Sequence, residues 1–214
     1  MDFVVQIIEQ MDLDRALGDI AHIHEQIAKS EVYRGYRSLP VAASGAMGLL
    51  AAWLQPRLLG ASAPPAFVAY WMASAVCAGL VGGSEIAYNY VVHDEAAARR
   101  RTRHVVGQFL PAVAAGGAIT VCVARFGDAQ IALLPGLWAI CFGLGTFASR
   151  PYLPRASGWV ALFYCAAGAA LLWTARGPWP PDGWRVGGTF GAGQLLAALV
   201  LYWNLERPDR GTGW

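Results

Sequence analysis

The sequence predicts an all-α polytopic membrane protein, a bundle of six transmembrane helices preceded by an amphipathic cytoplasmic helix. Three observations predict this class. Of the 214 residues, 56% are hydrophobic and only 14% are charged, whereas soluble domains have about 25% charged residues. The apolar residues gather into long blocks almost free of charge, as in chains whose solvent is lipid. Arginines form short clusters beside these blocks, where they would fix the orientation of the chain.

An amphipathic helix is predicted between Asp12 and Tyr36, in the segment 1–38 that precedes the first apolar block. Its apolar residues recur at three- and four-residue steps. The opposite face is acidic, which argues against adsorption to anionic lipid and favours docking on protein. We therefore expect Ile20, Ile23 and Ile27 to contact a partner protein or a second copy of the chain.

Six stretches approach or reach the length of a transmembrane helix, which is about 20 mainly apolar residues. They are Leu39–Leu54, Ala66–Val92, Val105–Ala124, Ala129–Ala148, Gly158–Ala175 and Val186–Leu205. The bundle therefore occupies residues 39–205, and 206–214 form a short cytoplasmic tail.

Pairs of small residues four positions apart predict close packing between helices, because they let two backbones approach. The pairs are Ser44 with Gly48, Gly79 with Gly83, Ala139 with Gly143, and Gly187 with Gly191.

Lysine and arginine alternate between the two sides of the predicted membrane. Twelve lie in the N-terminal segment, the second and fourth connections and the C-terminus, against four in the other connections. The positive-inside rule then places both termini in the cytoplasm, which requires an even number of spans. Tyrosine and tryptophan gather near both predicted interfaces, with Trp138 as the main exception. Small size, the charge bias and the lack of a signal-peptide pattern predict a bacterial inner membrane.

Glu85 is the only ionisable residue well inside a predicted span, and a carboxyl in that place is costly and commonly functional. Asn89 and His93 follow at four-residue steps, so the three share one stripe of a helix. Gln108 of the next span reaches a similar depth, which makes these four residues the candidate ion- or substrate-binding site. In the alternative, a protonated Glu85 fastens two helices by a hydrogen bond, and we weigh this reading slightly higher.

Four arginines of the second connection are candidates for binding anionic lipid headgroups. They are Arg99, Arg100, Arg101 and Arg103. The same cluster also serves as a topological anchor, and the two roles are compatible.

Motifs for catalysis, metal binding or cofactor binding are missing from the sequence. The histidines lack the spacing of a helical metal site, the four cysteines lack CxxC spacing, and no phosphate-binding glycine loop is present. We expect no metal, no cofactor and, at a net charge of +2, no nucleic-acid partner. The sequence favours a membrane scaffold or accessory subunit. The alternative is a small proton- or cation-coupled transporter or channel-like module that uses Glu85.

Overall fold

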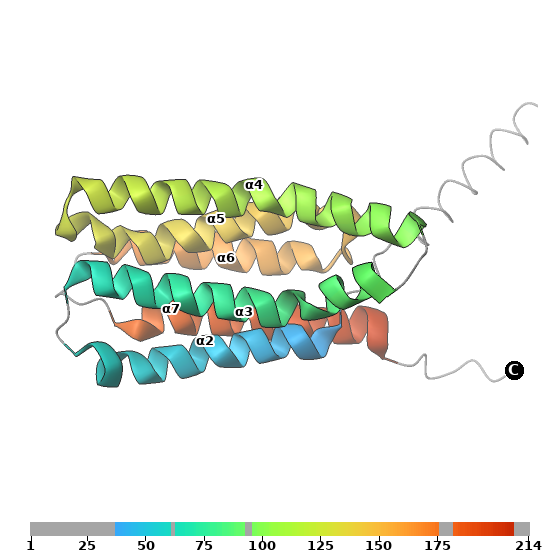
Figure 1. Cartoon of the computed structure of the whole chain (residues 1–214), viewed down its shortest axis with the longest axis horizontal. Coiled ribbons are helices and arrows are strands. Elements are labelled where there is room, and N and C mark those ends of the chain that lie inside the picture. The colour runs from blue at the N-terminus through green and yellow to red at the C-terminus, as the bar shows by residue number, and fades with distance from the viewer. Residues whose placement is uncertain (1–36, 61–62, 93–95, 176–181, 208–214) are drawn as a thin grey trace, which may run out of the picture. The chain divides into compact units, whose positions relative to one another are not determined.

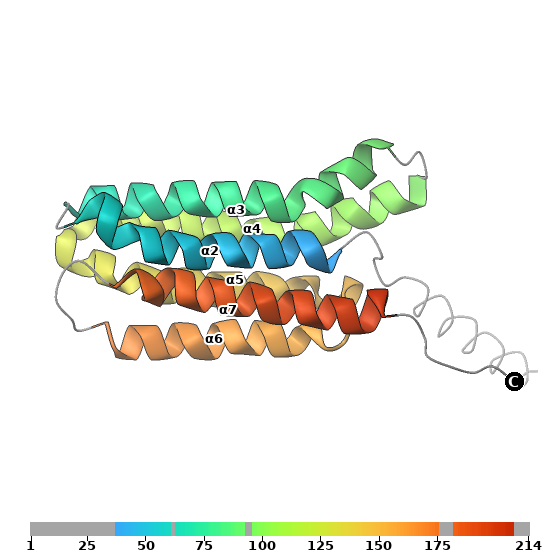
Figure 2. The same cartoon turned by 90° about the horizontal axis from the view of Figure 1, so that it is seen from below.

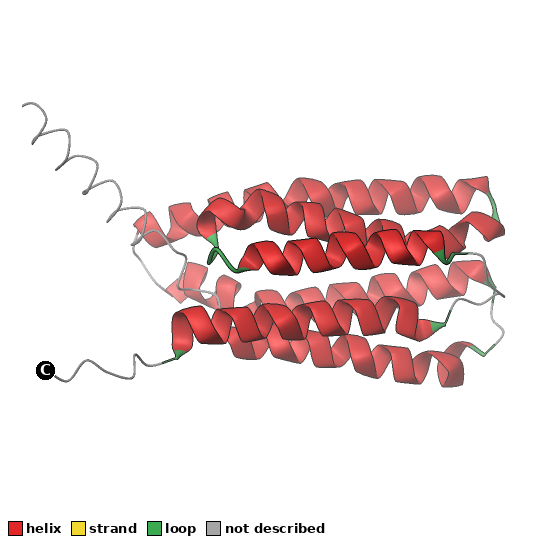
Figure 3. Cartoon of the chain, turned by 180° about the vertical axis from the view of Figure 1, so that it is seen from behind, coloured by secondary structure: helices red, strands yellow, loops and turns green. Residues whose placement is uncertain are grey.

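The computed structural model describes residues 37–60, 63–92, 96–175 and 182–207, with the backbone alone at 85, 86, 89–92, 96–102, 128 and 129. This described part contains helices and no strand (Figures 1 and 3). Its α-helices are α2 Ser38–Leu59, α3 Pro64–Val92, α4 Ala96–Phe126, α5 Leu134–Ser149, α6 Ser157–Trp173 and α7 Gly183–Leu201. Two 3₁₀ segments, η1 Asp128–Leu133 and η2 Arg150–Tyr152, flank α5, and a π-helical turn, η3 Tyr202–Glu206, follows α7.

The all-helical prediction is confirmed for the described part, and a helix lies at each of the six predicted spans. Five segments are long and apolar enough to cross a membrane: Ser38–Leu59, Pro64–Ser84, Arg103–Phe126, Gln130–Tyr152 and Gly183–Glu206. The remaining helix, α6, has 17 residues and falls short of that length. Five candidate spans are therefore established, and a sixth span stays a prediction.

The helices lie alongside one another and pack unequally (Figures 1 and 2). The closest associations join α2 to α7 and α5 to α6, and further contacts join α4 to α5 and α2 to α3. In contrast, α3 and α4, although consecutive, touch each other little. The bundle thus contains two tightly packed helix pairs, with α3 packing on α2 and α4 packing on α5.

Glycines allow the two tight pairs to form. A Cβ on Gly187 of α7 would clash with the backbone oxygen of Gly48 in α2, and a Cβ on Gly143 of α5 would lie 2.7 Å from Cys165 Sγ in α6. Three of the predicted small-residue pairs accordingly lie at helix contacts. The fourth pair does not, because a Cβ on Gly79 or Gly83 would meet nothing within 4 Å.

Hydrogen bonds from aromatic side chains join neighbouring helices in the interior. Trp71 Nε1 of α3 donates to Gln55 Oε1 of α2 at 2.7 Å, and Trp138 Nε1 of α5 donates to Thr120 Oγ1 of α4 at 2.8 Å. Trp138 therefore lies away from the predicted interface because its indole bonds another helix. Trp71 is only 4% exposed, so its indole packs inside the bundle. Every buried side-chain polar atom in the described residues has a partner.

The N-terminal end of α2 is bonded to the end of the last helix. Glu206 accepts from the Ser38 backbone N–H at 2.5 Å and from the Ser38 hydroxyl at 2.7 Å. The first helix residue has no intrahelical partner for its N–H, so a carboxylate from η3 satisfies a donor that would otherwise be left to water. This contact joins segments 168 residues apart in the chain.

Candidate functional site

Glu85 and Asn89 both lie in α3, so their predicted helical spacing is present. Within the part of α3 whose side chains are described without a gap, Pro64–Ser84 is long and apolar enough to cross a membrane, and the helix continues through Glu85 to Val92. The side chains of Glu85 and Asn89, and the whole of His93, lie outside what the structure describes. The predicted stripe is thus placed only as backbone positions 85 and 89 of α3.

The surroundings of Glu85 can be traced from the preceding turn of α3. A Cβ on Gly82 would lie 3.5 Å from the Ser44 hydroxyl oxygen of α2. Residues three apart lie on one side of a helix, so position 85 continues this side towards the end of α3. Ser44 itself donates to the Val41 carbonyl at 2.8 Å. α3 therefore passes beside the N-terminal half of α2 at Gly82, three residues before Glu85.

Gln108 does not join a buried site in the structure. Its side chain is exposed on α4, and α4 makes few contacts with α3. A Cβ on the preceding residue, Gly107, would also meet nothing within 4 Å. Of the four predicted ion-site residues only Gln108 has a described side chain, so the site itself stays a prediction.

The predicted lipid-binding arginines lie in helix rather than in a turn. Arg99, Arg100 and Arg101 belong to the first turns of α4, and the Arg103 side chain is exposed. The apolar part of α4 is Arg103–Phe126. This stretch was identified within the residues whose side chains are described, and Arg99, Arg100 and Arg101 precede it in the same helix.

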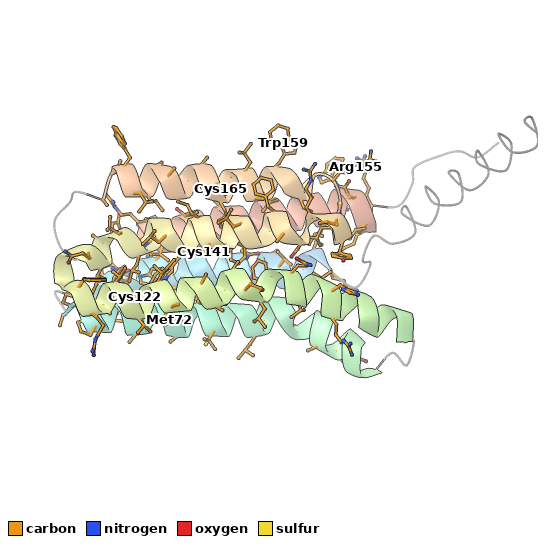
Figure 4. The ribbon with its side chains drawn as sticks, turned by 90° about the horizontal axis from the view of Figure 1, so that it is seen from above. Met72, Cys122, Cys141, Arg155, Trp159 and Cys165 are labelled. Carbon is orange, nitrogen blue, oxygen red and sulfur yellow. The ribbon has the colours of Figure 1, made fainter. Side chains whose placement is uncertain are left out.

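The predicted docking residues Ile20, Ile23 and Ile27 lie outside the described residues, so their interpretation stays a prediction. Within the described part, no group of three metal-ligating side chains comes together. The four cysteines are free, and those labelled in Figure 4 lie on separate helices.

A groove that the sequence did not indicate lies where α5 turns into α6. It has a volume of about 270 Å³ and is lined by Phe147, Arg150, Arg155, Gly158, Trp159 and Leu162. Figure 4 shows Arg155 at the turn and Trp159 at the start of α6. In the sequence, Arg150 and Arg155 are the two basic residues of the fourth connection. The signal in the sequence that could have indicated the groove is Trp159, which follows Arg155 at a four-residue step.

Besides the groove, the outward-facing sides of α3 and α4 form an exposed apolar surface. Only 11% of the apolar stretch of α3 and 17% of that of α4 is buried, against 33% for α2. Large apolar side chains are exposed on both helices, among them Val76, Leu80, Leu110 and Val121. We call this the α3/α4 face.

Comparisons of the chain with protein-family models, with curated proteins and with solved structures give no match.

Proposed function

We propose that the chain is an integral membrane protein with six spans and cytoplasmic termini, in a bacterial inner membrane, and that it serves as a scaffold or accessory subunit. The observation that carries the proposal is the α3/α4 face. It stays largely uncovered by the chain's own helices, whereas α2 packs closely on α7 and α5 packs closely on α6. We infer that another membrane protein covers part of this face.

The Gly79 and Gly83 pair supports this reading. Association of helices in lipid depends on close packing, which small residues four apart allow. Glycines of the same spacing are used inside the bundle, where Gly187 and Gly191 approach α2. Beside Gly79 and Gly83 the space is open, and the neighbouring Val76 and Leu80 are exposed. A transmembrane helix of the partner is the occupant that this surface fits.

The test is native mass spectrometry of the full chain, extracted gently from its own membrane. We expect a defined partner in the wild type and its loss in the double variant Gly79→Ile/Gly83→Ile, because the added side chains hold the partner helix away. Ala169→Ile is the matched control, since Ala169 is exposed on α6 away from the α3/α4 face. A folded double variant that keeps the partner would contradict the proposal.

The predicted N-terminal helix provides a second contact with the partner. Ile20→Asp, Ile23→Asp and Ile27→Asp place a charge on its apolar face, so each should weaken the complex. Glu25→Lys is the control on the polar face. Unchanged association in all three aspartate variants would remove this helix from the proposal.

Proton- or cation-coupled transport is the second candidate function, and the position of Glu85 favours it. The residue lies in α3 three positions after Gly82, where α3 approaches Ser44 of α2. A carboxyl there could bind a proton or cation that enters from the end of the bundle. In liposomes, Glu85→Gln should abolish pH-dependent flux and Glu85→Asp should retain part of it. Equal flux in Glu85→Gln and wild type would refute this assignment.

A further inference from the structure

We propose that the groove at the turn between α5 and α6 binds a membrane phospholipid with an anionic headgroup. The headgroup phosphate would lie between Arg150 and Arg155, and an acyl chain would follow Phe147 and Leu162 towards the interior of the membrane. The inference rests on the proposed membrane insertion and is independent of the scaffold role.

The turn brings the two arginines to one groove. Arg150 directly follows α5, and Arg155 lies two residues before α6 begins. The Arg150 side chain lies over Gly158, where a Cβ would be 3.4 Å from its Nε and 3.5 Å from its Cζ. Since residue 158 has no side chain, the space beside the guanidinium stays open and forms part of the groove.

Neither guanidinium has a hydrogen-bond or ion-pair partner among the described residues. Two carboxylates have described side chains, and both are engaged elsewhere: Asp182 accepts from the Trp184 backbone N–H, and Glu206 accepts from Ser38. The groove therefore presents uncompensated positive charge. A phosphate is the matching ligand, because arginine binds it through charge-assisted hydrogen bonds in a fixed, forked geometry.

The remaining lining of the groove is apolar and lies on the membrane side of the arginines. Phe147 precedes Arg150 by nearly one turn of α5, and Leu162 follows Gly158 by one turn of α6. Both side chains are exposed, as is Trp159 at 70%. Tryptophan is enriched where apolar and polar parts of the bilayer meet. This gradient from charge to apolar surface matches a phospholipid better than it matches a free anion.

Two contacts with α4 and one hydrogen bond within the turn hold the turn between α5 and α6 in place. The Tyr152 ring stacks on His104 of α4, with centroids 5.8 Å apart and planes at 13°. The Ser149 hydroxyl donates to the Val105 carbonyl at 3.4 Å, and the Ser157 backbone N–H donates to the Pro154 carbonyl at 2.8 Å. A groove fixed in this way loses little conformational freedom when a ligand binds.

The experiment is a lipid titration of the delipidated full-length protein, followed by native mass spectrometry. We expect long-chain phosphatidylglycerol to bind the wild type and to bind Arg150→Gln/Arg155→Gln about tenfold or more weakly, because each arginine contributes to headgroup attraction. Arg57→Gln/Arg125→Gln removes two arginines from the opposite end of the bundle and should bind as the wild type does. Trp159→Ala should weaken the long-chain lipid more than a short-chain analogue.

Equal phosphatidylglycerol binding by the groove variant and the wild type would overturn the inference. Equal binding of phosphatidylcholine would remove the requirement for an anionic headgroup, and full competition by inorganic phosphate would replace the lipid with a free anion. Membrane extraction of the wild type at alkaline pH is the separate check. Release of the wild type from the membrane fraction would contradict membrane insertion. If the wild type stays in the membrane and Arg150→Gln/Arg155→Gln binds phosphatidylglycerol as the wild type does, only the lipid site in the groove is contradicted.

Discussion

At the scale of single residues, the contact between Trp71 and Gln55 joins α3 to α2. Both side chains are buried, and the Gln55 amide oxygen accepts from the indole in a region that excludes water. We expect Trp71→Phe to lower the free energy of unfolding by about 0.5–2 kcal/mol, because it removes this donor and part of the packing around it. The measurement is the thermal unfolding midpoint in detergent.

Trp173→Phe is the matched control for that variant. Trp173 lies at the end of α6 and is 88% exposed, so the same substitution there should leave the unfolding midpoint nearly unchanged. An equal loss of stability in both variants would show that the contact between Trp71 and Gln55 has no special role.

At the scale of helices, glycine separates interior contacts from the exposed side of α3. Gly187→Ala should lower the free energy of unfolding by about 1–3 kcal/mol, because a Cβ there meets the Gly48 backbone, which cannot move independently of α2. Gly79→Ala adds the same methyl group to α3 where nothing lies within 4 Å. It should leave the isolated chain as stable as the wild type or slightly more stable.

Denaturant titration of the two purified alanine variants tests this contrast. A Gly187→Ala variant as stable as wild type would mean that α2 and α7 are not in the close register described. The contrast also separates stability from binding, because larger side chains at Gly79 affect the proposed partner and not the bundle.

The positions of the helices could be predicted from hydropathy, whereas their ends could not. The N-terminal turns of α4, from Ala96 to His104, lie before the predicted span because a search for apolar blocks does not detect polar helical turns. Conversely, α6 ends at Trp173, where the backbone N–H and hydroxyl of Thr174 both bond the Ala170 carbonyl. The sequence also could not distinguish Gly79 from Gly187, since only the packed neighbour differs.

The groove at the α5–α6 turn could not be predicted from the sequence for a similar reason. It depends on His104 stacking on Tyr152 and on Arg150 lying over Gly158, which are contacts between residues that no local pattern relates. Glu85 illustrates the opposite case. Its chemistry is visible in the sequence, but its level relative to Ser44 and α2 required the structure.

At the scale of the whole molecule, the proposed number of spans depends on α6. Its 17 residues rise about 1.5 Å each and give about 25 Å, near the lower limit for crossing a bilayer. The helix packs along α5 and also contacts α7. Trp159 and Trp173, both largely exposed, lie 14 residues apart near its two ends, at a separation of about 21 Å. This is the placement expected of anchors at two interfaces, with local thinning of the bilayer compensating for the short helix.

Cysteine labelling measures whether the number of spans is odd or even. In a cysteine-free background, we expect single cysteines at Ala63, Gly127 and Gly177 to react with a membrane-impermeant maleimide from outside the cell. Thr212→Cys should react only after the membrane is permeabilised, because six spans return the tail to the cytoplasm. If α6 stayed on the cytoplasmic side, α7 would cross in the opposite direction, so Gly177→Cys would be protected and Thr212→Cys would be labelled. The same reversal would place Arg207 and Arg210 outside and return Arg176 and Arg185 to the cytoplasmic side, so the positive-inside count is twelve to four in both arrangements. The labelling of Gly177→Cys and Thr212→Cys therefore decides between five and six spans where the charge count does not.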